Sequence, residues 1–147
     1  MRGNKKYCIF WIQESASLGY FTRLAPKNMR PHRKLIAWQE SIELVKKIYI
    51  ITSTFPETEK FGIISQLRRA AVSVPCNIAE GAGRNTKKEF RHFLYISSGS
   101  ASEVDTLLFI SKELGYIKEP EFNRLESLND KVSALLNGLI KSIKVAD

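Results

Sequence analysis

The chain has 147 residues, of which 44% are hydrophobic and 26% are charged, and its formal net charge is +8. This length fits one domain with a buried core, and the composition excludes a largely disordered chain. Two cysteines are too few for a disulfide framework or a zinc site, and no apolar run fits a signal peptide or a membrane span of about 20 residues. We therefore expect a cytoplasmic protein with no membrane partner.

Residues 1–30 form a basic extension without helical or strand periodicity. They carry six basic residues and one acidic residue (+5), whereas residues 31–147 carry 17 basic and 14 acidic residues (+3). One interpretation of the extension is an arm that binds nucleic acid. The interpretation that we favour is a flexible extension, with Met29 as the natural start. Residues 31–147 then make up the folded domain.

The first periodic segment predicts a helix over residues 34–53. Its apolar residues recur at steps of three and four, which is the spacing of one helical face. They are Leu35, Trp38, Ile42, Val45 and Tyr49, and Leu44, Ile48 and Ile51 widen the face. Phe55 and Pro56 end the helix, because a residue before proline is pushed out of the helical conformation.

A second helix is predicted over residues 65–84. Its apolar face consists of Ile64, Leu67, Ala71, Val74 and Ile78. Pro75 should kink this helix, or stop it and begin a new one, because proline removes an amide donor. Cys76 is expected to be a small buried residue and not a nucleophile. Gly81 and Gly83 are expected to close the helix in left-handed conformations.

Two more helices follow. Thr86 and Glu89 have the spacing of a capping box that starts the third helix, and Gly115 follows its last residue. Pro120 suits the first turn of the fourth helix. The apolar faces are Phe90, Leu94, Ser97, Ala101, Val104 and Leu108, then Leu125, Leu128, Val132, Leu135 and Leu139. Four amphipathic helices with short loops predict an all-α, antiparallel up-down-up-down four-helix bundle.

Polar residues form a stripe on the second helix opposite its apolar face. This polar stripe consists of Gln66, Arg69, Ser73, Asn77 and Glu80. Three of the five are uncharged, which favours a partly buried surface over an ordinary solvated face, although both interpretations stay open. The small residues of the run 97–102, which includes Ser97 and Ser100, allow close approach either within the bundle or to another subunit. Glu103 is a candidate ion-pair partner for Arg68 or Arg69.

Three sequence runs around residue 70 form a long signature: WQESIELVKKIYIITSTFPETEKFG, SQLRRAAVSVPCNIAEGAGR and KKEFRHFLYISSGSASEVDTLL. They closely resemble the four-helix-bundle family first noticed as open reading frames in the intervening sequences of bacterial 23S ribosomal RNA genes. The resemblance implies a ring-like homo-oligomer, a pentamer by analogy, without established enzymatic activity. The chain is also distantly similar to the basic accessory protein of diversity-generating retroelements, which works beside a reverse transcriptase and nucleic acid.

An up-down topology gathers basic residues from three segments at one end of the bundle. This basic end consists of Arg33, Lys34, Arg84, Lys87, Lys88, Arg91, Lys141 and Lys144. The opposite, acidic end gathers Glu57, Glu59, Glu113, Glu119 and Glu121 against Lys60, Lys112 and Lys118. Lys87 and Lys88 fall in the first turn of a helix, where the dipole disfavours cations and an anion would be stabilised. The alternative is a solvated basic rim without a ligand.

The sequence offers no catalytic constellation, and we expect no enzyme activity, cofactor or metal. Gly81, Gly83 and Arg84 lack the spacing of a P-loop, and no Glu-x-x-His pair is present for a di-iron site. We expect a non-catalytic homo-oligomeric bundle that binds RNA or DNA backbone through its basic end. The alternative is a protein-interaction scaffold whose partner is another protein.

Overall fold

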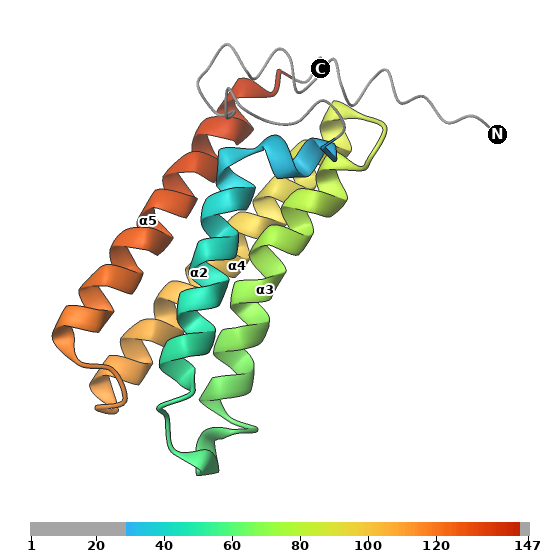
Figure 1. Ribbon diagram of the computed structural model, residues 1–147. Helices are drawn as coiled ribbons and strands as arrows, with labels where there is room; N and C mark the ends of the chain where they lie inside the picture. The colour runs from blue at the N-terminus through green and yellow to red at the C-terminus, as the bar shows by residue number, and fades with distance from the viewer. Residues whose placement is uncertain (1–28, 145–147) are drawn as a thin grey trace.

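The computed structural model describes residues 29–144, which form four α-helices and two 3-10 turns, with no strand in this part of the chain (Figure 1). The elements are η1 (Pro31–Lys34), α2 (Ile36–Thr52), η2 (Glu57–Glu59), α3 (Ile63–Ala82), α4 (Lys87–Glu113) and α5 (Glu119–Ser142). Successive helices run in opposite directions, which confirms the predicted antiparallel four-helix bundle. The predicted basic extension falls mainly on residues 1–28, which lie outside the described residues.

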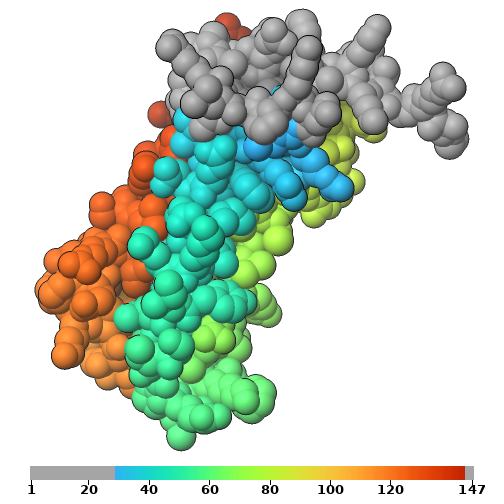
Figure 2. Space-filling view, in the orientation of Figure 1, coloured from blue at the N-terminus to red at the C-terminus, as the bar shows by residue number. Residues whose placement is uncertain are grey.

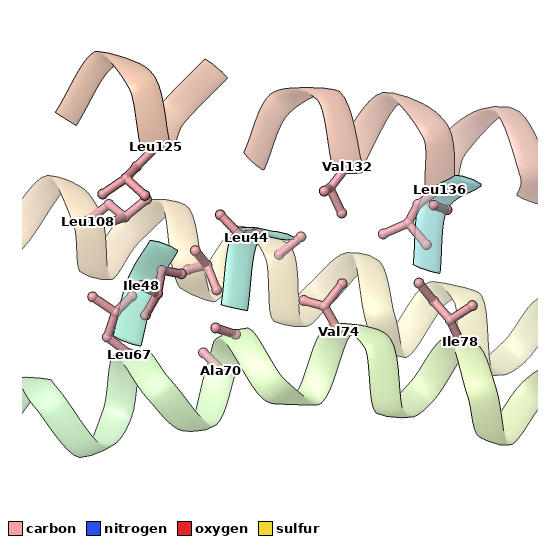
Figure 3. Packing of buried hydrophobic residues seen from close by; sticks show 14 of the residues in the cluster. Leu44, Ile48, Leu67, Ala70, Val74, Ile78, Leu108, Leu125, Val132 and Leu136 are labelled. Atoms are coloured by element: carbon pink, nitrogen blue, oxygen red, sulfur yellow. The ribbon is translucent and has the colours of Figure 1, made fainter. Parts of the chain in front are cut away.

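Each helix packs against its neighbour in the chain, and α5 packs back against α2. The core therefore lies along the axis between the four helices (Figure 3). Burying one large aliphatic side chain stabilises the fold by about 1.5–3 kcal/mol. The fully buried side chains at the centre are Leu44 and Ile48 of α2, Leu67, Val74 and Ile78 of α3, Leu108 of α4, and Val132 and Leu136 of α5.

The buried face of α2 is rotated from the predicted one. Leu44 and Ile48, which were expected only to widen the face, lie at its centre, and Tyr49 is 45% exposed. The remaining buried residues of this helix are Ala37, Ser41 and Thr52. Because these residues are small or polar, they do not form an apolar stripe in the sequence. The face predicted from the large apolar residues alone is therefore rotated about the helix axis from the face that is buried.

The helix α3 is continuous through Pro75, so the predicted stop and restart is wrong. Pro75 itself is buried. The prediction that Cys76 is buried is also wrong, because this free thiol is exposed. Cys76 lies four residues from both Val72 and Glu80, which are exposed, and residues at this spacing share one face of a helix.

The two glycines at the end of α3 do not take the expected left-handed conformation. Gly83 has φ of −88°, and Gly81 lies within the helix. Gly81 is required for another reason: a Cβ at this position would lie 2.7 Å from Cβ of Phe93 and 2.9 Å from Cδ2 of Phe90. The absent side chain therefore lets the end of α3 approach the start of α4 closely.

The ends of α4 and the start of α5 follow the sequence prediction. The Thr86 hydroxyl accepts a hydrogen bond from the amide of Glu89 at 3.2 Å and donates one to its carboxylate at 2.7 Å. Gly115 has φ of +75°, and the amides of Gly115 and Tyr116 donate to the carbonyls of Lys112 and Ser111. This is a Schellman closure. A proline in the first turn of α5 then begins the last helix.

One amide side chain is buried between α4 and α5. Asn129 is 2% exposed, and its Nδ2 donates to the carbonyl of Ala101 at 3.0 Å. Its Oδ1 is also buried and has no hydrogen-bond partner among the described residues. An unsatisfied buried acceptor destabilises a fold by about 1–3 kcal/mol. Asn129 therefore aligns two helices at some cost in stability.

Candidate nucleic-acid interface and polar stripe

The basic end is formed by three segments that lie together at one end of the bundle: η1, the turn between α3 and α4, and the end of α5 (Figure 1). The η1 turn packs against both α2 and α3, and Figure 2 shows it beside the upper part of α3. All eight predicted cations belong to these segments or to the first two turns of α4: Arg33, Lys34, Arg84, Lys87, Lys88, Arg91, Lys141 and Lys144. Arg30, directly before η1, is a further exposed cation that the prediction omitted.

The acidic groups nearest to these cations are engaged in local contacts. The Glu80 carboxylate accepts a hydrogen bond from the Arg84 guanidinium, which also lies 4.8 Å from the centre of the Phe93 ring. Glu89 is held by the cap of α4. The exposed cations Arg33, Lys88, Lys141 and Lys144 belong to three elements or their ends, namely η1, α4 and α5. The basic end therefore presents positive charge from several directions.

Arg91 is the most constrained cation of the basic end. Its Nη2 donates to the Tyr95 hydroxyl at 3.3 Å, and the guanidinium lies 5.7 Å from the centre of the same ring. Its Nε is buried and has no partner among the described residues. The contact with Tyr95 directs the guanidinium along the outside of α4, so Arg91 is less available to a ligand at the end of the bundle than its sequence position indicates.

His32 lies within the basic end but does not add to its charge. Its ring lies 5.3 Å from that of Trp38. Partial burial lowers the pKa of the imidazole, and the nearby positive charges of Arg33 and Arg30 lower this pKa further. The imidazole is therefore neutral at pH 7. The sequence shows His32 as an isolated histidine, and only the packing of η1 on α2 reveals its contact with Trp38.

The acidic end differs because its charged groups contact one another. Lys112 forms an ion pair with Glu119 at 2.8 Å, and this hydrogen bond is the main cause that raises the pKa of Lys112. The Tyr116 hydroxyl donates to Glu59 at 3.2 Å. Desolvation, and then the Glu59 carboxylate, raise the pKa of Tyr116. The acidic end therefore satisfies part of its charge internally.

The centre of the polar stripe is hydrogen-bonded within the chain. The hydroxyls of Ser73 and Ser100 lie 2.9 Å apart, and Nδ2 of Asn77 donates to the carbonyl and the hydroxyl of Ser73 at 2.8 and 2.9 Å. The buried Ser97 hydroxyl donates across the same helix pair to the carbonyl of Val74 at 2.9 Å. The small-residue run thus meets α3 inside the bundle, which is one of the two alternatives that the sequence left open.

The remaining residues of the predicted polar network lie apart from this centre. Gln66 accepts from Arg69 at 3.0 Å on the exposed surface. Arg68 points to α2, where its Nε donates to Thr52 at 2.8 Å. The Arg68 guanidinium also lies 4.7 Å from the centre of the Tyr49 ring. The suggested ion pair of Glu103 with Arg68 or Arg69 does not form, because both arginines are held by nearer partners.

The basic end and the polar stripe offer positive charge and hydrogen-bonding groups. Within residues 29–144, no group of three or more His, Cys, Asp and Glu side chains is arranged to hold a metal ion. None of the described helices combines the length and the apolar character that crossing a bilayer requires. The features that remain are a cationic end with a helix N-terminus, a hydrogen-bonded contact between α3 and α4, and the outward side of α4.

The chain was compared with known proteins. A crystal structure of a protein with unknown function, from the S23 ribosomal protein family of Bacteroides thetaiotaomicron VPI-5482, aligns with a TM-score of 0.67 and 22% sequence identity, covering 71% of this chain and 98% of that chain. This likeness shows a shared fold. The comparison with curated proteins finds no match. The sequence model of the 23S rRNA-intervening sequence protein family matches residues 33–138, and the chain belongs to this family.

Proposed function

We propose that this protein is a non-catalytic, cytoplasmic homo-oligomeric bundle whose basic end binds the phosphate backbone of RNA or DNA. The observation that carries the proposal is the convergence of eight cations from three segments at one end of the fold. The amides of the first turn of α4 belong to the same end, and the helix dipole there favours an anion. Phosphate groups satisfy both features at once.

Such binding depends on charge and not on base sequence. Contacts between cations and phosphates release counterions, so affinity falls steeply as the salt concentration rises. A homo-oligomer repeats the basic end in every copy, so weak contacts to one long nucleic acid gain by avidity. The ring of five that the family resemblance implies would place several basic ends on one assembly.

The test is a titration of the full chain with a structured RNA at two salt concentrations. The informative variant is Arg33→Glu combined with Lys141→Glu, because both side chains are exposed and lie on different segments of the basic end. We expect this double variant to weaken binding by about tenfold or more at low salt and to reduce the slope of log affinity against log salt by about two. Circular dichroism checks that the bundle is intact.

The matched control is Lys47→Glu combined with Lys118→Glu, which changes the net charge equally but lies away from the basic end. We expect its affinity to stay close to that of the natural chain. Undetectable binding of the natural chain at low salt would refute the proposal. Equal losses in the two double variants would show attraction by net charge alone and would remove the role of the basic end.

The second candidate function is a scaffold that binds another protein. It is favoured by the large apolar side chains that α4 and the residue after it expose, among them Tyr95 at 52%, Phe109 at 54% and Leu114 at 54%. Exposed apolar surface of this kind often marks protein contacts. A chain that fails to bind RNA or DNA at low salt but retains a homo-oligomeric mass would favour this function over the first.

A further inference from the structure

The acidic end carries the two most exposed large apolar side chains of the part of the chain that the structure describes. Phe61, in the loop before α3, is 88% exposed, and Ile50, in the last turn of α2, is 69% exposed. The Phe61 ring lies 6.0 Å from the Lys60 ammonium. One exposed apolar side chain is ordinary by itself. Two such side chains at one end of the bundle indicate a contact surface.

An apolar groove lies between the last turns of α2 and the first turns of α5. This α2–α5 groove is lined by Lys47, Ile50, Ile51, Glu121, Arg124 and Leu125. Its lining is mainly apolar, and its volume is about 210 Å³. An apolar cavity of about 150 Å³ is known to hold a benzene molecule. The α2–α5 groove therefore has room for one phenyl ring.

In one molecule, Phe61 and the α2–α5 groove are separated. Phe61 precedes α3, and Figure 1 shows α3 and α5 on opposite sides of α2. The ring and the groove nevertheless lie at the same level of the bundle, because α2 ends at the acidic end and both α3 and α5 begin there. A second copy that stands parallel to the first can therefore bring its Phe61 to the groove.

The charges around the ring and around the groove are complementary. The α2–α5 groove carries two cations and one carboxylate: Lys47, Arg124 and Glu121. The segment that leads to Phe61 carries two carboxylates and one cation: Glu57, Glu59 and Lys60. Glu59 accepts a hydrogen bond from Tyr116, which leaves Glu57 as the exposed acid that faces a partner. Charge pairs at the rim of a contact add little affinity, but they select the partner and its orientation.

The neighbouring charges do not upset this match. Lys46, one turn before Ile50, is paired with Glu43, and Glu119 at the start of α5 is paired with Lys112. Two further exposed charges at this end have opposite signs: Glu113 and Lys118. The groove therefore keeps a net positive rim, and the segment before Phe61 keeps a net negative one.

We propose that Phe61 of a second copy of this chain docks in the α2–α5 groove. The ring and the groove are different surfaces, so the contact is heterologous, and it closes into a ring when the rotation between neighbours divides a full turn. Since the two surfaces lie at one level, the copies stand parallel and all basic ends lie on the same face of the ring. The proposal rests on the homo-oligomeric part of the proposed function, and it adds the surfaces that meet.

The first test is the mass of the full chain without nucleic acid, measured by sedimentation velocity. We expect more than two copies. Phe61→Gln and Ile50→Gln each remove one apolar side of the contact, and we expect each to weaken the association of neighbours by about thirtyfold. The matched control is Tyr95→Gln, which replaces a 52% exposed side chain on α4 and should keep the natural mass. Circular dichroism confirms that the variants are folded.

The second test identifies which surfaces meet. Both natural cysteines are first replaced by serine. One variant then carries Thr58→Cys, close to the ring, and a second carries Lys47→Cys, at the groove; both positions are exposed. A short bismaleimide should join the two variants into covalent dimers after they are mixed as monomers and concentrated. Each variant on its own should stay uncrosslinked, because a heterologous contact brings different surfaces together.

Each outcome decides a different part of the proposal. A monomeric natural chain would refute both this contact and the homo-oligomer of the proposed function, and RNA binding is then measured on the monomer. A homo-oligomer whose mass Phe61→Gln leaves unchanged would refute this contact alone. Crosslinking of Thr58→Cys with itself, or a natural chain that stops at two copies, would overturn the heterologous arrangement. The absence of crosslinks in the mixture would separate Phe61 from the groove.

Discussion

The inner and outer faces of α4 show two different ways in which one helix uses small residues. On the inner face the Ser97 and Ser100 hydroxyls bond to α3, and the Phe90 ring and the Phe93 Cβ leave room only for a glycine at position 81. On the outer face Gly99 is surrounded by open space. The inner small residues therefore stabilise the bundle itself, whereas Gly99 meets no other part of the described chain.

The most sensitive position of the inner face is Gly81. We expect Gly81→Ala to lower the free energy of unfolding by about 2 kcal/mol, because the added Cβ overlaps Cβ of Phe93 at 2.7 Å and that atom cannot move without its helix. The gain of alanine over glycine in helix propensity offsets only part of this loss. Urea unfolding measures the change. A stability equal to that of the natural chain would show that α3 and α4 separate easily.

The next effect concerns the hydrogen bond from Ser97 to Val74. Ser97→Ala removes a fully buried donor, and we expect a loss of about 1 kcal/mol in the free energy of unfolding. The same change at Ser102, which is exposed on α4, should have an effect within about 0.5 kcal/mol of zero. Equal effects of the two alanine variants would contradict the distinction between the two faces.

Asn129 meets the inner face of α4 from α5, and its replacement should stabilise the fold. Asn129→Leu gives up the bond to Ala101 but removes an unsatisfied acceptor and buries apolar surface, so we expect a gain of about 1 kcal/mol. The midpoint of urea unfolding should rise with an unchanged slope. A fall in the midpoint would indicate that a water molecule satisfies the Oδ1 atom.

The smallest expected effect has the opposite sign to that of Gly81→Ala. Gly99→Ala should raise the free energy of unfolding by about 0.5–1 kcal/mol, because alanine is the better helix former and its Cβ meets no atom within 4 Å. The measurement is made at protein concentrations low enough to keep the chain monomeric. The changes in the free energy of unfolding caused by Gly81→Ala and Gly99→Ala should therefore have opposite signs, which distinguishes the two faces. A loss of stability in Gly99→Ala would show that a Cβ at position 99 is unfavourable in the folded chain.

The parts of the fold that depend on neighbouring residues could be predicted from the sequence. The cap at Thr86, the closure at Gly115 and the continuous apolar face of α3 are local features, and the structure contains all three. The gathering of the basic residues at one end also follows, because four helices in alternating directions leave few arrangements. Local rules identify these elements without knowledge of how the helices face one another.

The contacts between helices could not be predicted in the same way. The donation from Ser97 to Val74, the position of Asn129 and the stacking of Arg68 on Tyr49 depend on the rotation and register of one helix against another. Hydrophobic periodicity does not specify these quantities. Cys76 was expected to be buried because cysteine usually is. Its spacing of four residues from Val72 and from Glu80 places Cys76 on their exposed side of α3 and predicts its exposure better.

The even number of helices has a practical consequence for experiments on this chain. The described part begins at Met29, before η1, and ends at Lys144, after α5, and both points belong to the basic end (Figure 1). A purification tag, a fluorophore or a surface linker joined directly before Met29 or directly after Lys144 is therefore introduced beside the proposed phosphate contacts. The opposite loops, at η2 and at the turn between α4 and α5, are the attachment points that leave this end accessible.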